Sequence, residues 1–201
     1  MDFLKNNWCK MVMAVLVLTI AVFAFIMFIN AVQAGTAINT VLDTEGLSGD
    51  ELREERAPLS AARSATWIWL GVTLSSLAGV AFLVMKMVKM GKVGSYVLIG
   101  GGAVATILVV VGMILGADHV WLLSESAKAA AERYDNLPSG ASSEMVEGAR
   151  ALMRMTQMAH FNVIAQSVTL LIAFGLLPLA YGLKKVLCCC KKDAEKPAVQ
   201  E

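Results

Sequence analysis

The chain has 201 residues, of which 57% are apolar, and a mean hydropathy of +0.66; soluble domains are usually about 45–50% apolar. Its 17 basic and 16 acidic residues leave a formal net charge of only +1, so the protein as a whole lacks the strong positive field that attracts nucleic acid. We therefore expect no nucleic-acid partner, and the positions of the charges carry more information than their sum.

All of the charged residues lie outside four stretches, 11–42, 64–85, 93–117 and 155–183. Each stretch exceeds the roughly 20 apolar residues that a helix needs to cross the ~30 Å hydrocarbon core. We predict an all-α fold, a four-pass transmembrane helical bundle that forms a single integral membrane domain over residues 1–201. We expect spans at about 11–32, 64–85, 94–117 and 160–183, outer loops at 33–63 and 118–159, and a cytoplasmic tail at 184–201.

The first span follows Lys5 and Lys10, so a secretory signal peptide is an alternative reading. Val32-Gln33-Ala34 would suit a signal peptidase that cuts before Gly35. The apolar core from Met11 to Ile29 is about 19 residues long, however, and a typical signal peptide has only about 7–15. We expect a retained first helix; cleavage would leave three spans.

The first outer loop contains a helix signal of its own. Ser48 and Glu51 form a capping box, in which each side chain bonds the backbone N–H of the other. Pro58 lacks an N–H and predicts the end of this helix, so the second span begins near Ser60.

Small residues recur at helical spacing in the second and third spans. Such residues let membrane helices approach closely. Because a short turn joins these spans, we expect their small faces to pack together as an antiparallel hairpin; an interface between subunits is the alternative. The candidate packing and assembly residues are Gly71, Ser75, Gly79, Gly101, Ala105, Gly112 and Gly116, and Gly100, Gly101 and Gly102 mark a bend or a very close crossing.

The second outer loop reads as a helical hairpin that extends the third and fourth spans outside the membrane by about 25 Å. Turn residues at 136–140 separate two coiled-coil patterns. We expect the second helix to begin at Ser143, capped by its own hydroxyl. The predicted seam comprises Val120, Leu123, Ala127, Ala130 and Tyr134, facing Met145, Ala149, Leu152, Thr156, Ala159 and Val163.

The fourth span carries Asn162, Gln166 and Thr169 on one face. Interhelical hydrogen bonds in membranes average only about 0.6 kcal/mol, so we expect these side chains to serve as packing contacts. A water-filled path that they line is the alternative. Pro178 should kink the helix near its cytoplasmic end.

Two histidines, His119 and His160, are expected at the outer membrane surface, beside Asp118. Together they could bind a metal or a haem. Neither spacing is typical of such a site, so we expect interfacial hydrogen bonding and no cofactor.

The four cysteines lie at the ends of the chain, at Cys9 and in one run, so no disulfide is expected in the outer loops. The run directly follows the fourth span and is flanked by lysines, which is typical of S-acylation beside anionic lipid. The candidate lipidation sites are Cys188, Cys189 and Cys190.

The charge distribution predicts how the chain is oriented. The N-terminus, the 86–92 turn and the C-terminal tail hold ten Lys and no Arg against four acidic residues. The two longer loops hold seven basic residues against twelve acidic ones. Since basic residues next to membrane spans mark the cytoplasmic side, we expect both termini in the cytoplasm, in a plasma or inner membrane.

No nucleophile–base pair, intramembrane charge or metal motif occurs in the sequence, so we do not expect an enzyme. The layout is similar to that of tetraspanins, claudins and large-pore channel subunits, but the outer loops lack the cysteines those families generally use. We expect a non-catalytic, self-associating scaffold or structural subunit whose partners are the lipid bilayer, further copies or other membrane proteins. The alternatives are a pore-forming subunit and an accessory subunit of a larger membrane enzyme.

Overall fold

The computed structural model describes the backbone of residues 2–41 and 49–194, and the side chains of 7–39 and 53–187. Within these residues the chain is helical and contains no strand, which confirms the predicted all-α class. The helices are α1 (Asp2–Val41), α2 (Gly49–Met87), α3 (Gly91–Leu115), α4 (Ala117–Asp135), α5 (Ser143–Leu170), the π-helix η1 (Leu171–Leu176) and α6 (Leu177–Ala194).

Four of the described helical segments are long and apolar enough to cross a membrane, as the sequence predicts. Three of them lie within α1, α2 and α3, and the fourth runs through α5, η1 and α6 without a break in the helix. They indicate a membrane-embedded protein. Their bounds are Asn7–Asn39, Arg53–Met87, Gly91–Leu115 and Ser143–Leu187.

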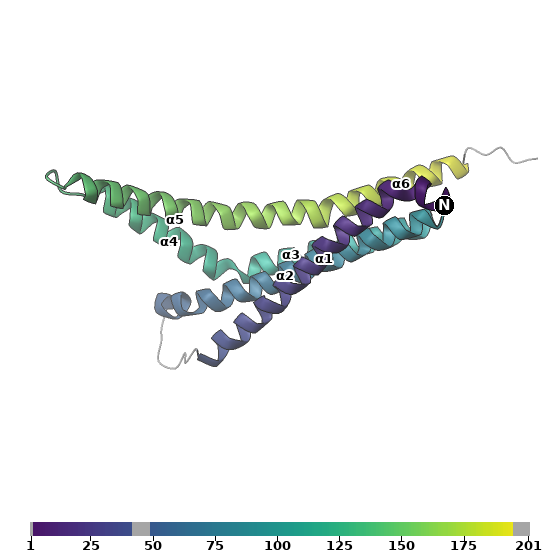
Figure 1. The fold of residues 1–201 in the computed structure, drawn as a ribbon. Helices are drawn as coiled ribbons and strands as arrows, with labels where there is room; N and C mark the ends of the chain where they lie inside the picture. Colours follow the sequence, from purple (N-terminus) through teal and green to yellow (C-terminus); the bar gives the residue numbers. More distant parts are fainter. Residues whose placement is uncertain (1, 42–48, 195–201) are drawn as a thin grey trace, which may run out of the picture.

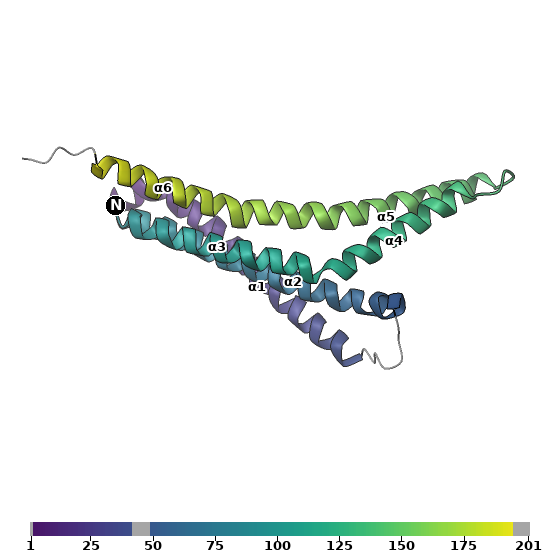
Figure 2. The ribbon, with the colours of Figure 1, turned by 180° about the vertical axis from the view of Figure 1, so that it is seen from behind.

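The helices form an elongated bundle with two different ends (Figure 1). At one, the terminal end, lie the N-terminus and α6. At the other, the hairpin end, α4 and the first part of α5 extend away from the rest of the bundle, as Figure 2 also shows. Helices α2 and α3 run side by side, and Lys89, with φ of 64°, makes the tight turn between them.

Helix α1 crosses α2 obliquely and has α2 as its main neighbour (Figure 1). Its buried positions include three alanines, Ala21, Ala24 and Ala31, which let the two backbones approach. Near the middle of the crossing the ring of Phe23 meets Trp69 edge-on, with 6.1 Å between their centroids. Most of the larger apolar side chains of α1 remain exposed.

We expected Pro58 to end a helix, and this prediction was wrong, because Pro58 lies inside α2. A proline in a helix removes one N–H and its ring presses on the carbonyl four residues earlier. The first turns of α2 accordingly bend away from the axis of the rest (Figures 1 and 2). The prolyl ring therefore redirects the chain without breaking the helix. The capping role expected of Ser48 lies outside the described residues.

The α4–α5 hairpin exists, but two details of its prediction were wrong. Helix α5 begins at Ser143 as expected, yet the capping hydroxyl is that of Ser142, which accepts a hydrogen bond from the Met145 backbone N–H at 3.3 Å. Of the six positions predicted for the α5 side of the hairpin contact, Ala149, Thr156 and Val163 are confirmed, and the other three are each displaced by one residue. Its less exposed positions are Val146, Ala149, Met153, Thr156, His160 and Val163, whereas Met145, Leu152 and Ala159 are exposed.

The helix containing Pro178 changes geometry one turn before the proline. Since Pro178 cannot donate to the carbonyl of Phe174, that carbonyl loses its helical partner. The backbone widens into the π-helix η1 over Leu171–Leu176, and the Ser75 hydroxyl of α2 donates to the Phe174 carbonyl instead. A neighbouring serine is a common way to satisfy such a carbonyl in a membrane helix.

Candidate functional site

A cavity lies between α2, α3, α4 and α5, which all contribute to its lining. Its volume is about 660 Å³. Ligand pockets commonly have this size and are mostly apolar, with a few polar groups that fix the ligand's orientation. It is lined by Ala61, Ser64, Ala65, Ile68, Trp69, Met113, Gly116, Ala117, His119, Val120, Trp121, Ser124, His160, Val163, Ile164, Gln166, Ser167 and Leu170.

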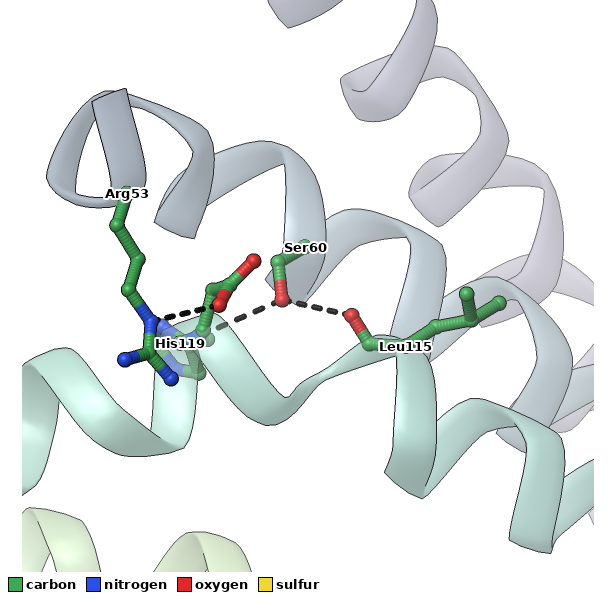
Figure 3. A network of polar contacts seen from close by, with 5 residues as sticks. Arg53, Ser60, Leu115 and His119 are labelled. Atoms are coloured by element: carbon green, nitrogen blue, oxygen red, sulfur yellow. Dashed lines mark hydrogen bonds and ion pairs between the residues drawn. The ribbon is translucent and has the colours of Figure 1, made fainter. Parts of the chain in front are cut away.

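A break in the helix between α3 and α4 forms one wall of this cavity. At Gly116 the chain leaves α3, and the new helix starts at Ala117. The buried hydroxyl of Ser60 lies at the break: it donates to the Leu115 carbonyl at 2.7 Å and accepts from the His119 backbone N–H at 3.4 Å (Figure 3). In an unbroken helix these two backbone groups would bond each other. A side chain inserted into that bond is a known cause of helix kinks.

Gly116 is required at the break because α2 passes so close to it. A Cβ atom at this position would lie 2.8 Å from the Ser64 hydroxyl oxygen. The glycine and the two serines of α2 together determine where α4 turns away, and so where the cavity opens.

An ion pair holds α4 against the start of α2 beside the cavity. The Arg53 guanidinium donates to the Asp118 carboxylate at 2.8 Å (Figure 3) and also lies 4.3 Å above the centre of the Trp121 ring. Both charged side chains are about 40% exposed, so the pair itself contributes little, roughly 0.2–1 kcal/mol. The paired Asp118 is not part of the cavity lining, whereas Trp121 is.

The cavity lining contains no Lys, Arg, Asp or Glu. Its titratable groups are the two imidazoles, and burial lowers the pKa of His119 because the charged form is desolvated. A second hollow of about 450 Å³ on the other side of the α2–α3 contact differs in this respect, since it is lined by Arg56, Arg63 and Asp118. The larger cavity is therefore the uncharged one.

The geometry does not assemble a metal site from the histidines. Among the described residues, no group of three or more His, Cys, Asp or Glu side chains could hold a metal ion. Asp118, the carboxylate nearest to the pair in sequence, is bound to Arg53. The sequence reasoning placed the two histidines near each other, and the structure places both on the wall of one cavity.

The polar residues of the fourth span lie on the uncovered side of α5. Asn162, Gln166 and Thr169 are all exposed, although Gln166 also reaches the rim of the cavity. Thr169 donates to the Ala165 carbonyl of its own helix at 2.7 Å. The two amides have no hydrogen-bond partner among the described residues.

The small residues lie at several different helix contacts. Gly71, Gly101, Gly112 and Gly116 are at the α2–α3 contact, where an added Cβ at Gly112 would be 2.9 Å from the Ser64 carbonyl oxygen. The carbonyl of Ala105, a fully buried residue, lies at the same contact. Gly79 faces Val17 of α1, and Ser75 faces η1. The small residues Gly71, Ser75 and Gly79 of α2 thus contact three different helices.

The sequence reasoning missed a further set of close contacts, between α3 and the η1–α6 segment. A Cβ at Gly102 would lie 2.8 Å from the Leu179 backbone nitrogen, one at Gly175 would lie 2.6 Å from the Thr106 hydroxyl oxygen, and one at Gly182 would lie 3.2 Å from the Ser95 carbonyl oxygen. The spacing of Gly175 and Gly182, one heptad apart, could have indicated this face.

The candidate lipidation sites cannot be placed, because the side chains of Cys188, Cys189 and Cys190 are not among those that the structure describes. Cys9 is exposed and makes no disulfide.

Comparison with protein-family models, with curated proteins and with solved structures finds no match. The functional argument therefore rests on the residues and geometry described above.

Proposed function

We propose that this chain is a non-catalytic membrane subunit that associates with further copies of itself through the exposed face of α5. The orientation that fits the lysine distribution has both termini in the cytoplasm of a cell with a plasma or inner membrane, and the hairpin end outside. The hairpin would then stand clear of the bilayer on the outer side.

The observation that carries this proposal is the exposure of Asn162 and Gln166 on a helix that is long and apolar enough to span a membrane. An amide without a partner costs several kcal/mol in hydrocarbon. A second copy of α5 would supply amides of the same kind, which both donate and accept hydrogen bonds.

The distribution of the small residues supports the same face. The candidate packing glycines Gly71, Gly79, Gly101, Gly112 and Gly116 all contact other helices of the same chain, so they are not available to a second subunit. By contrast, no residue of α5 is buried in the single chain, and Met155, Met158 and Phe161 are at least 64% exposed. Large apolar side chains around a pair of amides are suited to an interface between helices.

Native mass spectrometry of the chain in a mild detergent tests the proposal. We expect a species at an integer multiple of the 21.5 kDa chain, and we expect the double variant Asn162→Leu/Gln166→Leu to shift it to the monomer. Val104→Leu is the control, since it changes an exposed apolar side chain of α3 outside this face. A double variant that associates as the original chain does would contradict the proposal, and unrelated chains copurifying at fixed stoichiometry would indicate an accessory subunit instead.

A pore is the second candidate, because the same three polar side chains would face one another if copies of the chain surrounded a central axis. Single cysteines at Asn162, Gln166 and Thr169, in a chain whose native cysteines are replaced by serine, distinguish the two. Rapid labelling by a membrane-impermeant thiol reagent is expected for a water-filled pore. Protection at all three positions is expected for a dry interface.

A further inference from the structure

The cavity between α2, α3, α4 and α5 has a polarity gradient along the bundle axis. The two imidazoles and Ser124 lie nearer the hairpin end. Toward the terminal end the wall includes the apolar side chains of Met113 and Leu170; Gln166 and Ser167 lie one turn from Leu170, and the Ser167 hydroxyl already donates to the Val163 carbonyl of its own helix. His160 and Leu170 are ten residues apart on one continuous helix, which corresponds to about 15 Å.

This gradient lies at the point where the spanning segments meet the hairpin. Met113 and Leu170 belong to segments that are apolar enough to lie in hydrocarbon, whereas His119 is on α4, beyond the third span. An apolar wall without contacting atoms loses dispersion energy, and water would find few hydrogen-bond partners at that end. The deep part of the cavity therefore favours a hydrocarbon chain.

The shallow part specifies the head group. With no Lys, Arg, Asp or Glu in the lining, a charged head would have no counter-charge. A neutral imidazole, by contrast, both donates and accepts a hydrogen bond. Two of them, together with the Ser124 hydroxyl, suit hydroxyl and carbonyl groups.

We propose that this cavity binds one long-chain amphiphile with an uncharged, hydrogen-bonding head, the head beside His119 and His160 and the chain directed toward Leu170. The proposed head and tail contacts do not include Asn162, and Gln166 is the one lining residue that also belongs to the face proposed for self-association. The occupant belongs to the same chemical class as a monoacylglycerol, and not to that of a fatty-acid anion.

Titration of the delipidated full chain with monoolein, followed by native mass spectrometry, tests this directly. We expect one saturable monoolein per chain, and at least tenfold weaker binding of palmitate at pH 8. Ala65→Phe places a ring in the cavity and should abolish the saturable binding, whereas Val104→Phe, on an exposed face of α3, should not.

The double variant His119→Leu/His160→Leu tests recognition of the ligand's head group separately from binding of its hydrocarbon chain. It leaves the hydrocarbon part of the cavity intact, so we expect monoolein to bind roughly fivefold or more weakly and its advantage over palmitate to shrink. Thermal unfolding of each variant identifies any that fails to fold, and the folded histidine variant then provides the test in place of Ala65→Phe.

Three results would overturn the inference. One is the absence of saturable monoolein binding to the original chain. Another is equal binding by the Ala65→Phe and Val104→Phe variants, which would place the lipid elsewhere on the surface. The third is binding only to the dissociated monomer, which would mean that a second copy fills the cavity in the native assembly.

Discussion

The second and fourth spanning segments differ strongly in how much of them is covered by protein. In the most apolar stretch of the second, which lies in α2, 44% of the residues are buried; in that of the fourth, which runs through α5, η1 and α6, only 6% are. Helix α2 contacts α1, α3, α4 and η1, and its buried positions are rich in Ser, Gly and Ala. The uncovered face of α5 carries Met, Phe and two amides. The helix that is covered by other helices therefore carries small and hydroxyl-bearing side chains, and the uncovered helix face carries large ones.

The glycine triplet of α3 gives the strongest test of this contrast, because its three members face different surroundings. A Cβ at Gly101 would collide with that of Ala78 on α2, whereas one at Gly100 would meet nothing within 4 Å. We expect Gly101→Leu to destabilise the fold by about 1–3 kcal/mol or more through overpacking. Gly100→Leu, its adjacent control, should leave the free energy of unfolding nearly unchanged. Unfolding by SDS in mixed micelles measures both, and equal losses would contradict the assigned contact.

Two adjacent serines of α2 provide a finer test. The Ser75 hydroxyl satisfies the Phe174 carbonyl, while the buried Ser76 hydroxyl has no hydrogen-bond partner in the structure. We expect Ser75→Ala to cost about 1–3 kcal/mol, because the carbonyl is left without a donor. Ser76→Ala should be neutral or stabilising. The same unfolding measurement decides, and a larger loss for Ser76→Ala would show that the roles are exchanged.

The smallest effect is expected on α5, and it has the opposite sign. Gly148 is exposed, and an added Cβ would meet nothing within 4 Å. Gly148→Ala should therefore stabilise the helix by about 0.5–1 kcal/mol, since it reduces the backbone freedom lost on folding. Thermal unfolding monitored by circular dichroism would record a higher midpoint. A lower midpoint would mean that Gly148 is covered in the assembled protein.

Hydropathy and charge were sufficient to predict four helices long and apolar enough to cross a bilayer, because the length of an uncharged stretch determines this. The pair of helices between the third and fourth of these segments was predicted from coiled-coil spacing and turn residues. These patterns could not predict which side of α5 meets α4. Both Met145 and Val146, and both Leu152 and Met153, are apolar, so the pattern fits either rotation. In the structure Val146 and Met153 are the less exposed pair, and Arg150 donates a hydrogen bond to the Tyr134 hydroxyl of α4 at 3.1 Å.

The candidate cavity was only partly predictable for a related reason. The sequence indicated that His119 and His160 lie at the same level, but not that Ser60 interrupts the bond between Leu115 and His119. That arrangement depends on where a carbonyl of another helix lies. Pro58 misled the prediction similarly, since a proline bends a helix as readily as it ends one.

The hydrogen bonds of Ser60 and Ser75 can form only in a fixed order during synthesis. The Leu115 carbonyl that Ser60 binds is 55 residues further along the chain, and the Phe174 carbonyl that Ser75 binds is 99 residues further. At about 5–20 residues per second, the ribosome supplies the second carbonyl only after roughly 5–20 s. Until then the Ser75 hydroxyl can bond only to nearby groups, such as a carbonyl of its own helix. The helix that carries Phe174 can therefore dock on Ser75 only after α2 has been synthesised.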